Sequence, residues 1–176
     1  MRPTRDEWAM EVAKVTAKRS TCLRRNVGCV LLNARGHVLA TGYNGVAAGR
    51  PHCNEEVEDA PKDRCGVRVS STEWCHQRYG HEGGHGQFPH ACEGACSPSG
   101  TNLDGCEAIH AEQNALLQCK DVYAIDTCYC TTSCCVTCVK LLLNTSCRRI
   151  VFEEEYSQPH AKEMWEAAGR VWEMLR

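Results

Sequence analysis

Apolar and polar residues recur along the chain with two periods, one typical of helices and one typical of strands. Residues 4–20 have the helical period. Thr4 and Glu7 fit a capping box there, and the predicted apolar face consists of Trp8, Val12 and Val15. Two apolar runs then flank a turn-forming tetrapeptide. They predict a β-hairpin with strands over 27–33 and 37–42 and a turn over 33–36.

Beyond residue 105 the pattern alternates between helix and strand. The predicted elements are a helix over 108–120, a strand over 126–132, a helix over 135–145, a strand over 148–154 and a closing helix over 159–175. One side of the closing helix is expected to hold Met164, Trp165, Ala168, Val171, Trp172 and Leu175. Strands that alternate with helices predict an α/β layered fold, and 176 residues fit one domain over 1–176.

The segment 49–105 differs from the rest of the chain. It is rich in Cys, His, Gly and Pro and has little apolar periodicity. A structureless loop of this length is uncommon in a compact domain. We therefore expect either disorder or an insertion that metal ions stabilise.

Charge and composition narrow the possible functions. The net charge is −2, which argues against a general affinity for nucleic acid, because that requires clustered positive charge. No segment approaches the ~18 apolar residues of a membrane span, and the charged N-terminus lacks a signal core, so we expect no membrane association and a cytoplasmic protein. In such a protein, fifteen cysteines and eight histidines favour metal binding or catalysis over disulfides.

Four residues define a candidate catalytic zinc site. Cys135 and Cys138 are three apart at the start of a predicted helix, where the helix dipole favours thiolates. His110, in the first turn of the preceding predicted helix, is the third expected ligand. Three protein ligands leave the fourth position of zinc open for water, which is the catalytic arrangement. Glu112 follows two residues later and could move protons between that water and a substrate.

This order of residues is the signature of zinc nucleobase deaminases, in which H-x-E is followed by P-C-x-x-C. Cys134 replaces the usual proline and adds a thiol next to a ligand. Two alternatives remain open. A deaminase of tRNA adenosine or single-stranded DNA cytosine would need a basic channel and stacking aromatics, against which the charge and only two phenylalanines argue. A non-catalytic zinc-binding module would have no use for Glu112.

Further segments extend the match. STCLRRNVGCVLL, TGYNGVAAGRPHC, HAEQNALLQ, CCVTCVKLLLN and RRIVFEEEY occur in this order, and together they resemble the deoxycytidylate deaminases over residues 5–55 and 104–160. The resemblance implies a three-layer α/β/α cytidine deaminase-like fold with a five-stranded mixed sheet. It implies hydrolysis of dCMP to dUMP for thymidylate synthesis. It also implies a homohexamer that dCTP activates and dTTP inhibits, with Mg2+ accompanying the effector.

The resemblance also assigns substrate contacts. It implies that Asn44 binds the sugar and that backbone groups of Ala111 and Ser133 bind the base. It places Ser20, Arg24 and Arg25 near the phosphate and Tyr156 near the base or phosphate. Each has a simpler alternative: Asn44 could be a turn residue, the arginines a solvated surface, and Tyr156 a half-buried ring.

The remaining cysteines, together with four of the histidines, fall into three groups. The resemblance implies a structural zinc at Cys22, Cys53 and Cys106, and we expect His90 to complete it. A further zinc site in the insertion is a hypothesis, and the alternative is a lid whose thiols bind nothing. Its candidate ligands are Cys65, Cys75, His76, His81, His85, Cys92 and Cys96. Small apolar core residues are expected at Cys29, Cys119, Cys128, Cys130 and Cys147.

Overall fold

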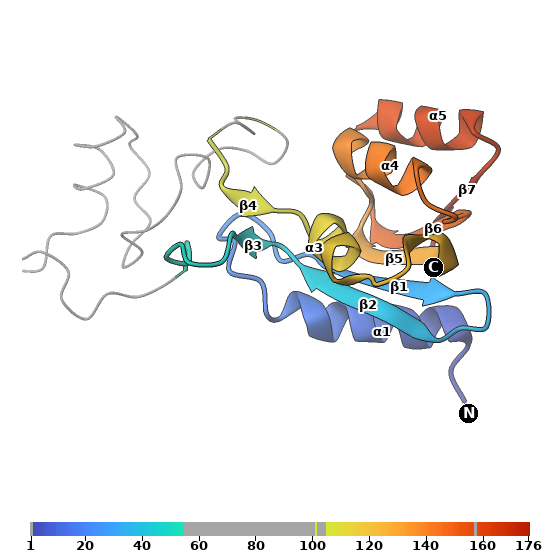
Figure 1. Cartoon of the computed structure of the whole chain (residues 1–176), viewed down its shortest axis with the longest axis horizontal. Helices are drawn as coiled ribbons and strands as arrows, with labels where there is room; N and C mark the ends of the chain where they lie inside the picture. The colour runs from blue at the N-terminus through green and yellow to red at the C-terminus, as the bar shows by residue number, and fades with distance from the viewer. Residues whose placement is uncertain (1, 55–100, 102–104, 157) are drawn as a thin grey trace, which may run out of the picture. The chain divides into compact units, whose positions relative to one another are not determined.

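The computed structural model describes residues 2–54, 101, 105–156 and 158–176 (Figure 1). The described residues form two compact units. The first contains residues 2–20, 26–44, 109–156 and 158–176, and the second contains residues 21–25, 45–54, 101 and 105–108. None of the helices in these ranges combines the length and apolar character that a bilayer crossing requires.

The first unit is built on a five-stranded mixed sheet with the strand order β2-β1-β5-β6-β7. Its strands are β1 (Gly28–Asn33), β2 (Val38–Tyr43), β5 (Ile125–Thr132), β6 (Arg149–Glu154) and β7 (Val171–Met174). β1 is antiparallel to both β2 and β5, while β5, β6 and β7 are parallel. The predicted hairpin is therefore confirmed, and so is the mixed sheet.

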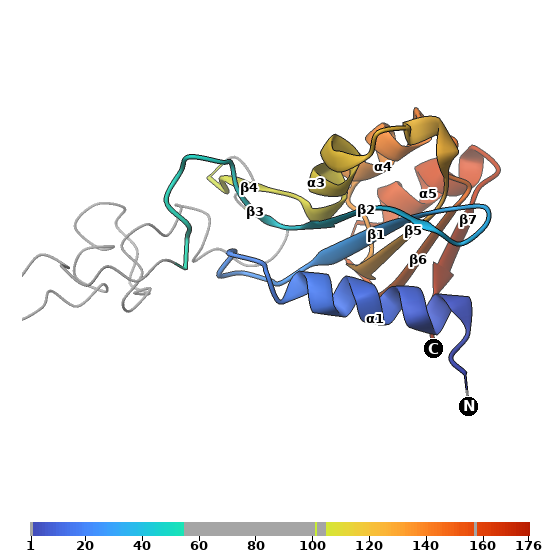
Figure 2. The same ribbon diagram turned by 60° about the horizontal axis from the view of Figure 1, so that its bottom comes forward.

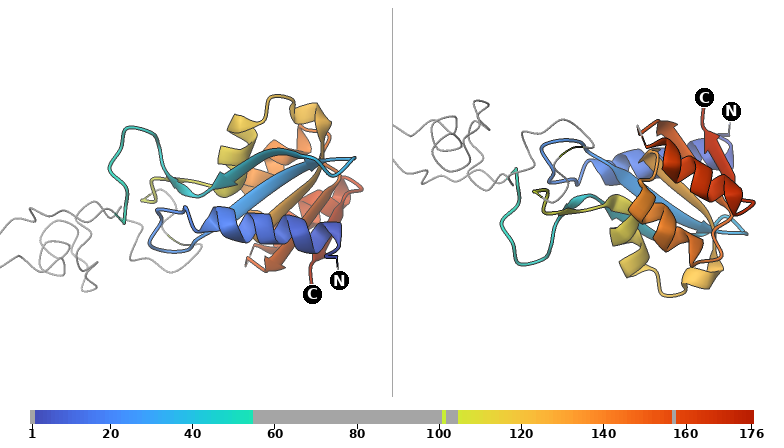
Figure 3. Two further views of the ribbon diagram at one scale, coloured as in Figure 1. Left: turned by 90° about the horizontal axis from the view of Figure 1, so that it is seen from below. Right: turned by 90° about the horizontal axis from the view of Figure 1, so that it is seen from above.

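Helices cover both faces of this sheet. α1 (Arg5–Ala17) packs on one face, and α3 (Ala111–Gln118), α4 (Val136–Leu143) and α5 (Pro159–Ala167) lie on the other (Figure 2). Figure 3 shows α1 in blue across the sheet in its left panel and the other three helices in its right panel. A short 3-10 helix, η2 (Val122–Ala124), leads into β5. The predicted three-layer α/β/α fold is confirmed.

The buried face of α1 differs from the prediction. The capping box of Thr4 and Glu7 is present, but Trp8 and Val15 are 39% and 62% exposed. The residues buried on this helix are Ala9, Met10, Ala13 and Ala17. A Cβ on Gly28 would lie 2.0 Å from the carbonyl oxygen of Ala13, so the helix backbone approaches β1 too closely for large side chains. Small residues, Ala13 and Ala17, therefore lie at the contact with Gly28, and the larger Met10 packs in the core cluster that contains Val30 and Leu32.

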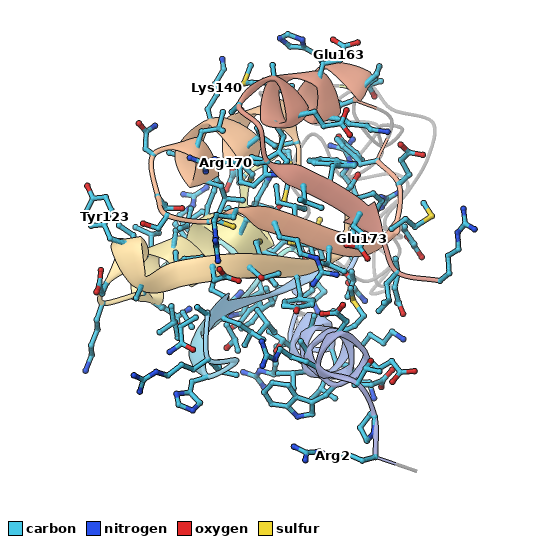
Figure 4. The ribbon with its side chains drawn as sticks, turned by 90° about the vertical axis from the view of Figure 1, so that its right-hand side faces the viewer. Arg2, Tyr123, Lys140, Glu163, Arg170 and Glu173 are labelled. Carbon is cyan, nitrogen blue, oxygen red and sulfur yellow. The ribbon has the colours of Figure 1, made fainter. Side chains whose placement is uncertain are left out.

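The prediction of one closing helix over 159–175 was wrong. α5 ends at Ala167, Gly169 has a φ of 73°, and β7 begins at Val171. A positive φ is favourable only for glycine, so the helix stops there. The side chain of Arg170, labelled in Figure 4, connects the turn between α5 and β7 to the end of α4 and the loop after it. It donates to the carbonyl oxygens of Leu142, Leu143, Thr145 and Cys147.

Side chains of the central strands are buried on both faces of the sheet. Cys29 and Leu31 pack on the side of α3, α4 and α5, whereas Val30 and Leu32 pack on the side of α1. This alternation follows from the two-residue period of a strand. Burial is complete at four of the cysteines predicted for the core, Cys29, Cys128, Cys130 and Cys147. The prediction was wrong for Cys119, which lies half-buried just after the last turn of α3.

An ionic network joins α1 to the sheet. Arg149 donates from Nη1 and Nη2 to the two carboxylate oxygens of Asp6, at 2.9 and 2.7 Å. The hydroxyl of Tyr129 donates to the same carboxylate at 2.6 Å, and Arg149 also bonds Glu173 of β7 at 2.9 Å. Hydrogen bonding from Arg149 is the main cause that lowers the pKa of Asp6.

We expect Asp6→Asn to lower the free energy of unfolding at pH 7 by about 1.5–3 kcal/mol, the usual value of hydrogen bonds to a charged group. Because the pKa of Asp6 is lowered in the folded protein, its stabilisation is present above the unfolded pKa of about 3.9 and disappears as the pH falls through the folded value. Urea unfolding at pH 7 and at successively lower pH measures both effects.

The matched control is Glu11→Gln, because Glu11 forms an exposed ion pair with Lys14. Such surface pairs contribute about 0–1 kcal/mol, so this variant should unfold almost like the wild type. A difference between Asp6→Asn and wild type that stayed constant down to pH 2 would contradict the proposed role of the Asp6 carboxylate.

The second unit contains most of a two-stranded sheet of β3 (Gly45–Val46) and β4 (Ala108–Ile109). Arg50 and Glu107 form an exposed salt bridge of 2.9 Å. The predicted insertion over 49–105 lies almost entirely outside the described residues.

Candidate metal and catalytic site

The three predicted zinc ligands converge at the starts of two helices. His110 is the N-cap of α3 and Cys135 is the N-cap of α4, while Cys138 lies in the first turn of α4. Nδ1 of His110 is 3.3 Å from Sγ of Cys135 and 3.5 Å from Sγ of Cys138. His110 thus precedes its helix, whereas the prediction placed it in the first turn.

These distances fit a tetrahedral zinc ion. With a Zn–N bond of about 2.0–2.1 Å and a Zn–S bond of about 2.3 Å, tetrahedral ligands would have their nitrogen and sulfur atoms about 3.5 Å apart. The three ligand atoms all lie within 4.8 Å of one another. An imidazole and two thiols are also the donor types that zinc prefers. The residues present therefore fit zinc with three protein ligands.

The two thiols differ in their tendency to ionise. Hydrogen bonds from Cys138 and then His110 lower the pKa of Cys135 to about 4. The hydrogen bond with Cys135, and then burial, raise the pKa of Cys138. Cys135 is thus a thiolate at neutral pH, and Cys138 needs a bound cation to release its proton.

Glu112 lies beside this ligand set on the first turn of α3. Its side chain is only 4% exposed, and burial raises its pKa to about 7. A carboxyl group with a pKa near neutral pH can both accept and donate protons. Glu112 therefore has the ionisation behaviour of a general acid and base, in a helix turn next to the predicted metal ligand His110.

Two glutamines stabilise the helix starts that carry the ligands. The side-chain oxygen of Gln113 accepts from the backbone N–H of His110 at 2.9 Å, and that of Gln158 accepts from the N–H of Val136 at 3.1 Å. The sequence interpretation missed both. The His110-x-x-Gln113 spacing resembles a capping box and could have indicated the first. Gln158 is 22 residues from its partner, and no local signal marks it.

Asn44 is held in a fixed orientation. It is 8% exposed, and its side-chain oxygen accepts from the hydroxyl of Ser20 at 2.7 Å and from the N–H of Val27 at 2.8 Å. The hydroxyl of Ser20 also lies 3.0 Å from the carbonyl oxygen of Asn44. The structure thus brings Ser20 against Asn44, the residue predicted to bind the sugar.

The other predicted substrate contacts of the first unit lie near the two helix starts. Ala111 is fully buried as the first residue of α3. Ser133 is 4% exposed; its N–H donates to the carbonyl oxygen of Glu154, and its hydroxyl accepts from the N–H of Tyr156 at 2.7 Å. Tyr156 is half-buried against the apolar core. Their roles toward a substrate remain predictions.

The second unit contains the remaining described candidates. Arg24 donates to the carbonyl oxygen of Thr101 at 3.0 Å, and Arg25 is half-buried. Cys22 and Cys106 are hydrogen-bonded to each other, and Cys53 is buried in the same unit. The other predicted structural ligands lie outside the described residues: Cys65, Cys75, His76, His81, His85, His90, Cys92 and Cys96.

Gly42 lets the helix of the candidate site approach the sheet. A Cβ on Gly42 would lie 2.2 Å from the carbonyl oxygen of Ala111 and 2.4 Å from the amide nitrogen of Ala115. Backbone atoms cannot yield as a flexible side chain can, so α3 would have to shift. The position of Glu112 at the start of α3 therefore depends on this glycine.

We expect Gly42→Ala to lower the free energy of unfolding by about 1–3 kcal/mol, the usual cost of overpacking. Thr41→Ala is the matched control, because successive strand residues face opposite sides of a sheet. Denaturant unfolding of both variants measures this effect. Wild-type stability in Gly42→Ala would contradict the close packing of α3 on β2.

Comparisons with known proteins agree with these features. The family described as the cytidine and deoxycytidylate deaminase zinc-binding region matches residues 3–154. Deoxycytidylate deaminase of Schizosaccharomyces pombe is 33% identical over 171 residues, which are 96% of this chain and 43% of that protein. The chain thus spans less than half the length of this relative.

Two viral proteins match over nearly their full length. Deoxycytidylate deaminase of Mycobacterium phage D29 is 32% identical over 155 residues, covering 88% of this chain and 98% of the phage protein. The crystal structure of dCMP deaminase from the cyanophage S-TIM5 in complex with dCMP and dUMP has a TM-score of 0.63 at 22% identity and covers 99% of each chain. This second similarity supports the fold.

Proposed function

Because this chain belongs to the family of the cytidine and deoxycytidylate deaminase zinc-binding region, we propose that it hydrolyses dCMP to dUMP and ammonia. The observation that carries this proposal is the convergence of His110, Cys135 and Cys138 at zinc-ligand distances beside the buried carboxyl group of Glu112. The relatives named deoxycytidylate deaminase support the choice of substrate.

His110, Cys135 and Cys138 would hold the zinc ion. When bound, zinc supplies a Lewis acid that makes water a nucleophile at neutral pH. Cys135 contributes a thiolate before the metal binds, and the start of α4 stabilises negative charge through the helix dipole. Gln113 and Gln158 fix the two helix starts, so the ligand positions do not depend on the metal alone.

Glu112 moves the protons of the reaction. In its ionised form it accepts a proton from the water as the water oxygen bonds to the amino-bearing ring carbon, and it delivers that proton to the ring nitrogen of cytosine. It then moves the proton of the hydroxyl group now on that carbon to the exocyclic amine, the carbon–nitrogen bond breaks, and ammonia leaves. The pKa of about 7 suits both proton uptake and proton release by Glu112, because neither form of the carboxyl group is strongly favoured at neutral pH.

Substrate binding is assigned to residues of the predicted set. Asn44 would bind the sugar, because its amide is oriented by Ser20 and by the backbone of Val27. Backbone groups of Ala111 and Ser133 would bind the base. Ser20, Arg24, Arg25 and Tyr156 are the candidates for contacts with the phosphate, for which the guanidinium fork of arginine is suited.

Further properties complete the proposal. A structural zinc would involve Cys22, Cys53 and Cys106, which the contact between two of these thiols supports. The active form would be a homohexamer, activated by dCTP and inhibited by dTTP with Mg2+. The product dUMP would supply thymidylate synthesis in the cytoplasm.

An ammonia-release assay tests the proposed activity. The purified chain is given dCMP, dCTP, cytidine, deoxycytidine, tRNA adenosine or single-stranded DNA cytosine, each with and without dCTP or dTTP as an added effector. We expect the highest kcat/KM on dCMP, stimulation by dCTP and inhibition by dTTP. Deamination of a polynucleotide but not of dCMP would contradict the proposed substrate, and release from none would contradict catalysis.

A further inference from the structure

A group of thiols lies in the sheet behind the catalytic residues. Cys29 is on β1, and Cys128 and Cys130 are on β5. In the β1–β5 register Cys29 is directly opposite Cys130, and Cys128 is two residues from Cys130 on the same strand. All three side chains therefore point to one face of the sheet, as the two-residue period of strands requires.

The sulfur atoms of this group are in mutual contact. Sγ of Cys128 is 3.5 Å from Sγ of Cys29 and 3.6 Å from Sγ of Cys130, and the three atoms all lie within 4.8 Å of one another. A fourth thiol, Cys134, is 3.9 Å from Cys130. Three sulfurs around one ion at metal–sulfur distances of about 2.3 Å would be about 4 Å apart in a planar arrangement. Shifts of a few tenths of an ångström would reach that geometry.

The group is separate from the zinc site proposed above, since it shares none of the ligands His110, Cys135 and Cys138. Its three thiols are completely buried, and all three lie on two adjacent, hydrogen-bonded strands, one on β1 and two on β5. The strand backbones hold these thiols close together before any ion binds. The donor set contains only sulfur, and thiolates select soft ions such as Cu+ over hard ones.

We propose that Cys29, Cys128 and Cys130 form a second metal site that binds a soft, thiophilic ion, with Cu+ as its representative. The thiols release protons to the solvent when the ion binds, and the ion supplies the positive charge that compensates the buried thiolates. Cys134 borders the site and also lies within 4.8 Å of Glu112, together with Cys130. The site thus adjoins the catalytic carboxyl group.

The test measures the total number of metal ions per chain in the zinc-loaded, full-length protein before and after anaerobic incubation with Cu+ and a competing chelator. Exchange of copper for zinc leaves the total unchanged, whereas a new site raises it by one. We expect this rise in the wild type and in Cys147→Ala, a control that removes a buried thiol outside the group. We expect no rise in Cys29→Ala or Cys128→Ala.

An unchanged total in the wild type, or the same rise in wild type and Cys29→Ala, would overturn the proposal. X-ray absorption at the copper edge of the wild type is independent of whether the variants fold. Three sulfur neighbours for the additional ion support the site. A nitrogen neighbour would overturn it, because the group contains no histidine.

Discussion

Glu112→Gln is expected to lower kcat for dCMP by at least about 10²–10⁴-fold, the usual contribution of a general acid or base. Glutamine has nearly the same shape but cannot accept or release a proton at neutral pH. Glu112 is buried with a pKa of about 7, so no bulk water replaces its function. Steady-state ammonia release from dCMP measures the effect.

The same variant separates chemistry from structure. Since Glu112 is not one of the three proposed zinc ligands, the zinc content of Glu112→Gln should equal that of the wild type.

The metal-free form of this variant should also differ in stability. Burial raises the pKa of Glu112, so in the metal-free wild type the ionised carboxylate disfavours the folded state increasingly from pH 4.5 to above 7. The glutamine variant should therefore unfold at a higher denaturant concentration than wild type at pH 8. Wild-type kcat in this variant would remove Glu112 from the mechanism.

Cys138→Ser is expected to abolish measurable turnover by removing a zinc ligand. Loss of an outer partner of a ligand already costs about 10–100-fold in metal affinity, and loss of a ligand should cost more. The side chain of Cys138 is completely buried and 3.5 Å from Nδ1 of His110, so no solvent-exposed group can take its place. Zinc bound per chain, measured after dialysis, should fall by one.

Cys134→Ala is the matched control for this prediction. Cys134 immediately precedes a ligand and is 1% exposed, but it does not belong to the His110, Cys135 and Cys138 group. This variant should retain the wild-type zinc content. Full zinc content and turnover in Cys138→Ser would show that another residue binds the metal.

The residues of the proposed catalytic site could be predicted from the sequence, because the members of each motif are close neighbours along the chain. His110 and Glu112 are two residues apart, and Cys135 and Cys138 are three apart at a helix start. Residues at either spacing at a helix start lie within one helical turn of each other, so their side chains are close together. The strand between the two motifs then limits how they can meet. The glutamine cap by Gln158 was not predictable, because it depends on a contact between distant segments.

The predictions of the buried face of α1 and of the closing helix were wrong because both depend on tertiary packing, which the periodicity of apolar residues does not encode. In α1 the sequence pattern emphasises large side chains, but close approach to Gly28 requires small ones such as Ala13. Near the C-terminus, Val171 and Trp172 continue a helical spacing, yet Gly169 ends the helix and pairing with β6 turns the segment into a strand. The contact between Cys29 and Cys128 depends on strand register, which the sequence alone did not determine.

The most direct test of the proposed zinc site is a crystal structure of the protein purified with zinc, with the anomalous signal of zinc used to locate each ion. We predict one ion that contacts Nδ1 of His110 and the sulfur atoms of Cys135 and Cys138, with Glu112 beside it and no fourth protein ligand. A fourth protein atom bound to that ion, or zinc absent from these three residues, would contradict the proposed hydrolytic deamination.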